Sequence, residues 1–226
     1  MSKGKLIVLE GLDGSGKATQ AKLLAEHLAA QGVPVQKITF PDYASDSSAL
    51  VKMYLAGQFG QHPDDVNAYA ASSFYAVDRY ASYKTSWGSF YEQGGVIIAD
   101  RYTTSNAVHQ TSKLPPQERQ TFLDWLFDFE YRKLGLPEPD RVLYLDVPTE
   151  LSEQMMRRRE QLTHTAADIH ERDEAYLRSC RESAAMVVDY GGWTRIDCAR
   201  DGQVRSVDDI HREVMERLRD LLEGIK

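Results

Sequence analysis

Short apolar segments alternate along the chain with longer segments in which apolar residues recur at helical spacing. The apolar segments are rich in β-branched residues and bounded by glycine, proline or charged residues; they are KLIVLE (5–10), VPVQKITF (33–40), GVIIAD (95–100), RVLYLDV (141–147) and WTRIDC (193–198). Segments of this length and composition are typical of buried parallel strands. Helices are predicted between and after them, over residues 17–31, 47–57, 64–91, 116–133, 149–160, 169–188 and 206–223.

The alternation of strands and helices predicts an α/β fold. It implies right-handed crossovers and a parallel sheet that is covered on both faces. We therefore expect a single domain over residues 1–226, with about five parallel strands.

The last predicted helix, over residues 206–223, is the most clearly amphipathic, and Ser206 and Asp209 have the spacing of a capping box at its start. Its apolar stripe is formed by Val207, Ile210, Val214, Leu218 and Leu221.

Composition and charge narrow the class of protein. With 42% hydrophobic and 27% charged residues, the chain has the composition of an ordinary globular protein. A net charge of −7 argues against an extended nucleic-acid surface, although a local group of amides and arginines can still bind a small anion. The two cysteines, Cys180 and Cys198, have no zinc-site spacing and suggest thiols in a reducing compartment. The chain has no signal-peptide pattern and no run long enough to cross a membrane, so we expect a cytoplasmic protein.

A glycine-rich segment between the first strand and the first helix is the strongest chemical signal. The segment GLDGSGKAT comprises Gly11, Leu12, Asp13, Gly14, Ser15, Gly16, Lys17, Ala18 and Thr19. It nearly matches the phosphate-binding pattern G-x-x-x-x-G-K-[ST], in which backbone N–H groups surround the phosphates and the lysine reaches the outer ones. The alternative is a strand-to-helix turn with an incidental lysine. The strand–loop–helix context favours the phosphate site.

The loop departs from the pattern at one position that concerns magnesium. The residue after Lys17 is Ala18, where a hydroxyl normally contacts Mg²⁺, and Thr19 comes one residue late. Because the next residue on a helix points about 100° away, Thr19 is a poor substitute. Mg²⁺ usually keeps several waters, so another water can take the place of the lost ligand. We expect Asp100, at the end of the third predicted strand, to face the metal region.

Together with further segments, this loop resembles the thymidylate kinase family almost from end to end. The segments that occur in family order are TFPDY (39–43), FYAVDRY (74–80), DRYTTSNAVHQ (100–110), LPEPDRVLYLDVP (136–148) and DIHERDEAYL (168–177). The resemblance implies the reaction ATP + dTMP → ADP + dTDP, with Mg²⁺, as a step of dTTP biosynthesis. It also implies a homodimer. Neither a nucleic acid nor a membrane is expected as a partner.

The resemblance assigns roles on the acceptor side. By this resemblance Tyr75 would stack on the thymine and Arg79 would reach a base carbonyl. The two residues are four apart and share a helix face. Arg101 would hold the acceptor phosphate. The remaining assignments are the base edge for Ser105 and Asn106, the sugar for His109, the pocket wall for Phe40 and Tyr43, and both nucleotides for Asp13. Taken from the residues alone, Tyr75 is more often a core residue, since aromatic residues on helices usually are. A strand-end ion pair is the alternative for Asp100 and Arg101.

A charged segment over residues 157–173 is expected to be a lid over the triphosphate. Cations are needed there because charge spreads over the oxygens of the transferred group. Arg157, Arg158 and Arg159 are the candidates, and a solvated helix end is the alternative. By resemblance Asp168 and Glu171 lie near the acceptor sugar; otherwise they cap and solvate the following helix.

The proposed chemistry needs no strong general base, because the acceptor is already an anionic phosphate. Catalysis then depends on in-line positioning and on charge neutralisation by Lys17, Arg101, a lid arginine such as Arg157 or Arg158, and Mg²⁺. Three other classes of protein are alternatives. A deoxynucleoside kinase would need a carboxylate to accept a hydroxyl proton. A GTPase-type switch would need an N-K-x-D motif, which the sequence lacks. A catalytically weak nucleotide-binding homologue is the third, and Ala18 keeps it open.

Overall fold

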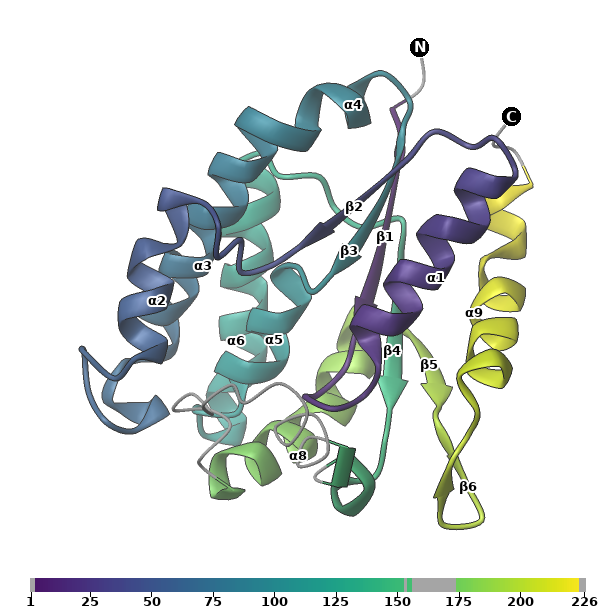
Figure 1. Cartoon of the computed structure of the whole chain (residues 1–226). Coiled ribbons are helices and arrows are strands. Elements are labelled where there is room, and N and C mark those ends of the chain that lie inside the picture. The colour runs from purple at the N-terminus through teal and green to yellow at the C-terminus, as the bar shows by residue number, and fades with distance from the viewer. Residues whose placement is uncertain (1–2, 153, 156–173, 224–226) are drawn as a thin grey trace.

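A five-stranded parallel sheet forms the centre of the protein. The computed structural model describes residues 3–152, 154–155 and 174–223 (Figure 1). The strand order is β2-β3-β1-β4-β5. Its strands are β1 (Lys5–Glu10), β2 (Val35–Thr39), β3 (Val96–Asp100), β4 (Arg141–Asp146) and β5 (Thr194–Asp197), and all neighbouring pairs are parallel. The predicted α/β class and strand number are confirmed.

Side chains of alternate residues along each strand enter opposite layers of the core. On β1, Ile7 and Leu9 pack against α1 (Lys17–Ala30) and α9 (Val207–Leu222), whereas Leu6 and Val8 face the other layer. The second layer is built from helices that lie on the far side of the sheet from α1 and α9 (Figure 1). These are α2 (Ala49–Leu55), α3 (Ala68–Ser82), α4 (Gly88–Glu92), α5 (Thr103–Thr111), α6 (Pro116–Phe127) and α8 (Glu174–Gly191).

Several elements differ from the prediction in extent. The helix predicted over 64–91 begins at Ala68 and continues as α3, a π-helical turn (Tyr83–Trp87) and α4. The helix predicted over 169–188 is described from Glu174 and continues to Gly191. A second π-helical turn, Asp128–Lys133, extends α6. Local propensity does not distinguish a π turn from an α turn, since the difference depends on which side chains the fold buries.

Two elements were not predicted as such. Helix α5 contains eight buried residues of nine, but only Ala107 and Val108 are apolar, so its sequence shows no apolar stripe at helical spacing. A two-stranded antiparallel hairpin, β6 (Ala199–Arg200) and β7 (Gln203–Val204), follows β5. The predicted capping box of α9 is confirmed in one of its two bonds, because Ser206 Oγ accepts a hydrogen bond of 3.1 Å from the N–H of Asp209.

Two adjacent strands end in carboxylates at the same edge of the sheet. In the register of β1 with β3, Leu9 lies opposite Asp100, and β1 ends one residue later at Glu10. Open α/β sheets bind ligands at the carboxyl ends of their strands. The glycine-rich loop follows β1 directly and Arg101 follows β3, so both predicted phosphate-binding segments start from this edge.

Candidate active site

The loop between β1 and α1 has the backbone geometry of an anion site. Gly16 is the N-cap of α1 with φ 85°, and Gly11 has φ 150°. A Cβ on Gly11 would lie 2.6 Å from the carbonyl oxygen of Leu145, so only glycine fits there. No described side chain caps the helix, and its first turn holds no acidic residue. The N–H groups at the start of α1 are therefore available to an anion, which the helix dipole also favours.

Lys17 is buried within this loop. Its Nζ donates to the backbone oxygen of Leu12 at 2.8 Å and to Ser15 Oγ at 3.4 Å. Burial, followed by the nearby charge of Arg101, lowers the pKa of Lys17 to about 8. The lysine is thus a poorly solvated cation whose two partners are neutral oxygens. Phosphate oxygens would be stronger partners for it.

Ala18 and Thr19 are both exposed on the first turn of α1. A magnesium ion would therefore depend on Asp100, a residue that is 9% exposed and whose charge lies close enough to act on the pKa of Lys17. Among the described residues no group of three acidic, histidine or cysteine side chains could hold a metal by itself. One carboxylate with waters and substrate phosphates is the usual environment of Mg²⁺. The residues present therefore fit a magnesium ion that is bound together with its nucleotide.

Arg101 links the loop to β3 and α5. Its guanidinium forms an ion pair with Asp13 of the loop and donates through Nη1 to Ser105 Oγ at 3.2 Å. The backbone of Arg101 has φ 68°, a conformation that costs a non-glycine residue energy, and its N–H donates to the oxygen of Leu9. Strain of this kind concentrates at functional sites.

Glu10 is a residue of the site that was not predicted from the sequence. The last residue of β1 is fully buried, yet it is a carboxylate that accepts hydrogen bonds from Gly11, Thr104 and Ser105. Arg101 Nη1 lies 3.9 Å from its Oε1. The available signal was a charged residue at the end of an otherwise apolar strand, directly before the glycine loop.

His109 lies beside Arg101, one helical turn beyond Ser105. Its Nε2 is 3.4 Å from Arg101 Nη1, and its Nδ1 is 3.5 Å from Cys180 Sγ. The ring stacks near Tyr176, with 6.2 Å between ring centroids. Burial, and then the charge of Arg101, lowers the pKa of His109 to about 3, so the imidazole is neutral at physiological pH.

Asn106 and Arg79 have partners within the protein. Asn106 Nδ2 donates to the backbone oxygen of Ser72 at 3.2 Å, which ties α5 to α3. Arg79 is 1% exposed and donates through Nε and Nη2 to Glu130, at 2.7 and 2.5 Å. Its Nη1 lies 3.4 Å from the oxygen of Tyr102. Glu130 has no signal in the local sequence, because the pair joins positions 51 residues apart.

The aromatic residues assigned to the acceptor pocket lie in different environments. Tyr75 is half-buried and meets Tyr54 edge-on, with 6.5 Å between ring centroids. Phe40 is buried in the core next to Tyr102, at 6.0 Å, whereas Tyr43 is 55% exposed. Arg157, Arg158, Arg159, Asp168 and Glu171 lie outside the described residues.

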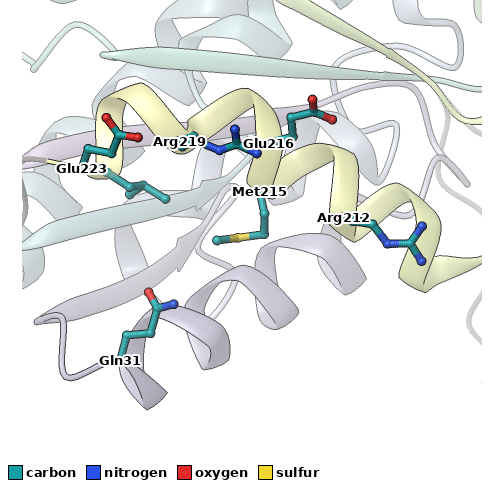
Figure 2. Close-up of a pocket in the computed structure, with 7 residues that line it drawn as sticks. Gln31, Arg212, Met215, Glu216, Arg219 and Glu223 are labelled. Atoms are coloured by element: carbon teal, nitrogen blue, oxygen red, sulfur yellow. The ribbon is translucent and has the colours of Figure 1, made fainter.

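A groove of about 620 Å³ lies on the surface between α1 and α9, away from this site (Figure 2). Gln31, which follows the last turn of α1, lines it, whereas the glycine loop precedes the first turn. The other lining residues are Arg212, Met215, Glu216, Arg219, Leu222 and Glu223. The groove is lined by side chains of both charge signs.

No helix of the described part of the chain is long and apolar enough to cross a membrane.

The fold and the site together define a class of protein. A parallel sheet whose first strand leads through a glycine-rich loop into a helix, with a buried lysine and an arginine at the carboxyl edge, is the arrangement of a P-loop phosphotransferase. Residues 9–214 match the family model described as thymidylate kinase. The chain belongs to the thymidylate kinase family.

Similar proteins agree with this membership. A thymidylate kinase of Mycobacterium tuberculosis is 34% identical over 170 residues, which cover 74% of this chain and 78% of that protein. A probable thymidylate kinase of Pyrococcus horikoshii is 28% identical over 223 residues, covering 99% and 100% of the two chains. The structure of thymidylate kinase from Candida albicans matches with a TM-score of 0.72 at 22% identity, covering 98% of this chain and 94% of that one. That likeness concerns the fold.

Proposed function

We propose that this enzyme transfers the γ-phosphoryl group of ATP to dTMP, forming ADP and dTDP. The observation that carries the proposal is the meeting of two cations at the carboxyl edge of the sheet. Lys17 comes from the loop and Arg101 from the end of β3, and they lie close enough for the charge of Arg101 to lower the pKa of Lys17. Lys17 is held by neutral oxygens and Arg101 by Asp13, a partner that a phosphate can replace. Two such cations at an open helix N-terminus suit two phosphate groups that must be brought together.

The proposed mechanism depends on positioning and charge. Lys17 exchanges its bonds to Leu12 and Ser15 for oxygens of the ATP phosphates, and the N–H groups of the loop hold the remainder. Arg101 exchanges Asp13 for the phosphate of dTMP, which places the attacking oxygen near the γ-phosphorus. A magnesium ion held beside Asp100 would neutralise the β- and γ-phosphate oxygens.

We propose that the nucleoside part of dTMP binds beside α3 and α5, which carry Tyr75 and His109. Tyr75 offers a ring face for stacking on the base, and neutral His109 lies next to Arg101, where a sugar would follow the phosphate. Ser105, Asn106, Phe40 and Tyr43 are proposed to complete this side. Arg79 binds Glu130 through Nε and Nη2, and its Nη1 bonds the backbone oxygen of Tyr102. We propose that Arg79 contacts the base through Nη1.

The segment 157–173 is proposed as the lid. Arg157 and Arg158 are the proposed phosphate contacts and Asp168 and Glu171 the proposed sugar contacts, on the basis of family resemblance. Single alanine substitutions at the two arginines, measured by the KM for ATP, test the first assignment. Unchanged ATP kinetics in both variants would remove them from the site.

A coupled ADP-release assay tests the proposed activity. The purified chain is tested with ATP and Mg²⁺ against dTMP, dCMP, AMP and thymidine. We expect dTMP to be the best acceptor and thymidine to be inert. Turnover of thymidine would favour a deoxynucleoside kinase, and comparable turnover of dCMP or AMP would contradict the acceptor assignment. Binding of dTMP without turnover at any Mg²⁺ concentration would favour a catalytically weak homologue.

Three further properties belong to the proposal: one domain over 1–226, a homodimer and a cytoplasmic location. The exposed side of α3 supports the homodimer, because Tyr69, Val77 and Tyr80 are 38%, 45% and 37% exposed there. Light scattering of the wild type and of Val77→Glu tests the homodimer, and a monomeric wild type would overturn it.

The cytoplasmic location is supported by Cys180 and Cys198, which are both buried free thiols and suit a reducing compartment.

A further inference from the structure

Glu10 is the buried carboxylate of the site for which the reaction provides no evident role. Burying a carboxylate is expensive unless it is fully hydrogen-bonded, and Glu10 is 0% exposed. Its Oε1 accepts the N–H of Gly11 at 2.9 Å. Its Oε2 accepts the hydroxyls of Thr104 at 2.6 Å and Ser105 at 2.8 Å. The side chain thus joins the start of the phosphate loop to the first turn of α5.

These bonds fix the direction of the Ser105 hydroxyl. A hydroxyl has one proton, and that of Ser105 is given to Glu10. The lone pairs of Ser105 are then left for Arg101, whose Nη1 donates to the same oxygen at 3.2 Å. Glu10 therefore acts on Arg101 in two ways, through this oriented hydroxyl and through its own charge at 3.9 Å.

Arg101 has two carboxylate neighbours of different character. Asp13 belongs to the glycine loop, and its side chain is 18% exposed, similar to the 19% of Arg101. Glu10 is sealed from solvent and held by three hydrogen bonds. An incoming phosphate can therefore replace Asp13 on the guanidinium, but it cannot replace Glu10.

We propose that Glu10 is a positioning residue for the acceptor phosphate: it holds the Arg101 guanidinium and the Ser105 hydroxyl in place while dTMP displaces Asp13. The inference rests on the proposed function, because it takes Arg101 as the acceptor-phosphate contact. It assigns to Glu10 no contact with substrate and no proton transfer. What Glu10 supplies is a fixed geometry that a neutral side chain of the same size does not reproduce.

Glu10→Gln is the direct test, because glutamine keeps the size and can still accept from Gly11. Its amide nitrogen must face Thr104 and Ser105, which reverses the hydroxyl of Ser105 and removes the charge beside Arg101. We expect KM and Kd for dTMP to rise about tenfold, while KM for ATP changes less than twofold. Glu213→Gln on α9 is the matched control, since Glu213 also pairs with two arginines, Arg205 and Arg217, but lies outside the site.

A double-mutant cycle separates positioning from general structural support. Calorimetric Kd values for dTMP are measured for Glu10→Gln, Arg101→Ala and the double variant. If Glu10 acts through Arg101, then Glu10→Gln changes the Kd less than twofold once Arg101 is gone. An equal effect in both backgrounds, or an unchanged dTMP KM in the single variant, would overturn the inference.

Thr104→Val provides a second route if Glu10→Gln does not fold. It removes one of the three bonds that hold Glu10 and nearly preserves shape. We expect a dTMP Kd about threefold weaker, again only when Arg101 is present; no change would overturn the inference. Failure of the proposed function is distinguishable, because it appears in the wild type as the absence of dTMP turnover, before any variant is compared.

Discussion

Replacing Lys17 by methionine should stabilise the free protein while it removes kinase activity. Lys17 is 6% exposed, and burial together with Arg101 lowers its pKa from 10.5 to about 8. Each pKa unit corresponds to about 1.4 kcal/mol, so the charged lysine costs the folded state about 3 kcal/mol. Methionine has a similar length and no charge. It forfeits the hydrogen bond to Leu12, about 1 kcal/mol, which leaves a net gain of about 2 kcal/mol at pH 7.

The pH dependence distinguishes charge from packing. The folded-state pKa lies below the unfolded one, so the penalty is complete below pH 8, decreases as the pH rises, and vanishes by about pH 10.5. The advantage of Lys17→Met should therefore shrink over the same interval. Comparing the variant with the wild type at each pH removes the contributions of other titrating groups, such as Lys113, whose pKa burial also lowers to about 8.

The assay is thermal and urea denaturation of the nucleotide-free protein between pH 7 and 10.5. For a chain of this length a gain of 2 kcal/mol corresponds to a Tm higher by about 4–8 °C. Lys22→Met is the control, because Lys22 lies on the same helix with 69% of its side chain exposed. A Lys17→Met protein no more stable than the wild type at pH 7 would refute the reasoning. So would an advantage that stays constant with pH, since it would come from packing.

Four other substitutions test separate parts of the site. Arg101→Ala should lower kcat/KM at least about 100-fold, because its contact strengthens in the transition state; a loss under threefold would leave it only a structural role. Ala18→Ser should tighten the apparent Mg²⁺ affinity about fivefold with little change in dTMP KM, and an identical Mg²⁺ titration would mean that another group already fills the position. His109→Gln should lose about 3 kcal/mol less free energy of unfolding than the wild type between pH 6.5 and 4, because in that interval His109 takes up a proton only in the unfolded wild type. Equal losses in the two proteins, measured by urea denaturation, would refute the low pKa. Glu130→Ala should destabilise the fold by about 3–5 kcal/mol, because it leaves Arg79 buried without its partner. The double variant Arg79→Met/Glu130→Leu should recover most of this loss; a double variant less stable than Glu130→Ala in urea denaturation would refute the reasoning.

The local pattern of the chain was sufficient for the architecture. Strand and helix periods are properties of neighbouring residues, so five strands and the long helices could be predicted with errors at their ends. Helix α5 was not predicted as an element because its sequence is mostly polar although the fold buries it, so it shows no apolar stripe. The hairpin β6–β7 was missed because its strands have two residues each, too few for a period.

The phosphate loop is the part of the site that the sequence by itself determined. Its glycines, the helix N-terminus and Lys17 are contiguous, and backbone N–H groups need no distant partner to face an anion. The burial that lowers the pKa of Lys17 depends on residues distant in the sequence, because it arises only when the loop packs against its surroundings.

The pairing of charged side chains was decided only by the tertiary structure. Arg101 pairs with Asp13 across 88 residues, and Arg79 pairs with Glu130 across 51. The carboxylate of Glu10 likewise accepts the hydroxyl of Ser105 across 95 residues. Motif spacing located these arginines but could not indicate which carboxylate each would face, because that depends on the register of β1 with β3 and on how α5 and α6 pack behind the sheet. A buried charged side chain needs a partner of opposite charge, and only the folded chain decides which residue lies near enough. The chain therefore specifies where phosphate binds through local geometry, and how firmly the acceptor arginine is held through contacts that exist only after folding.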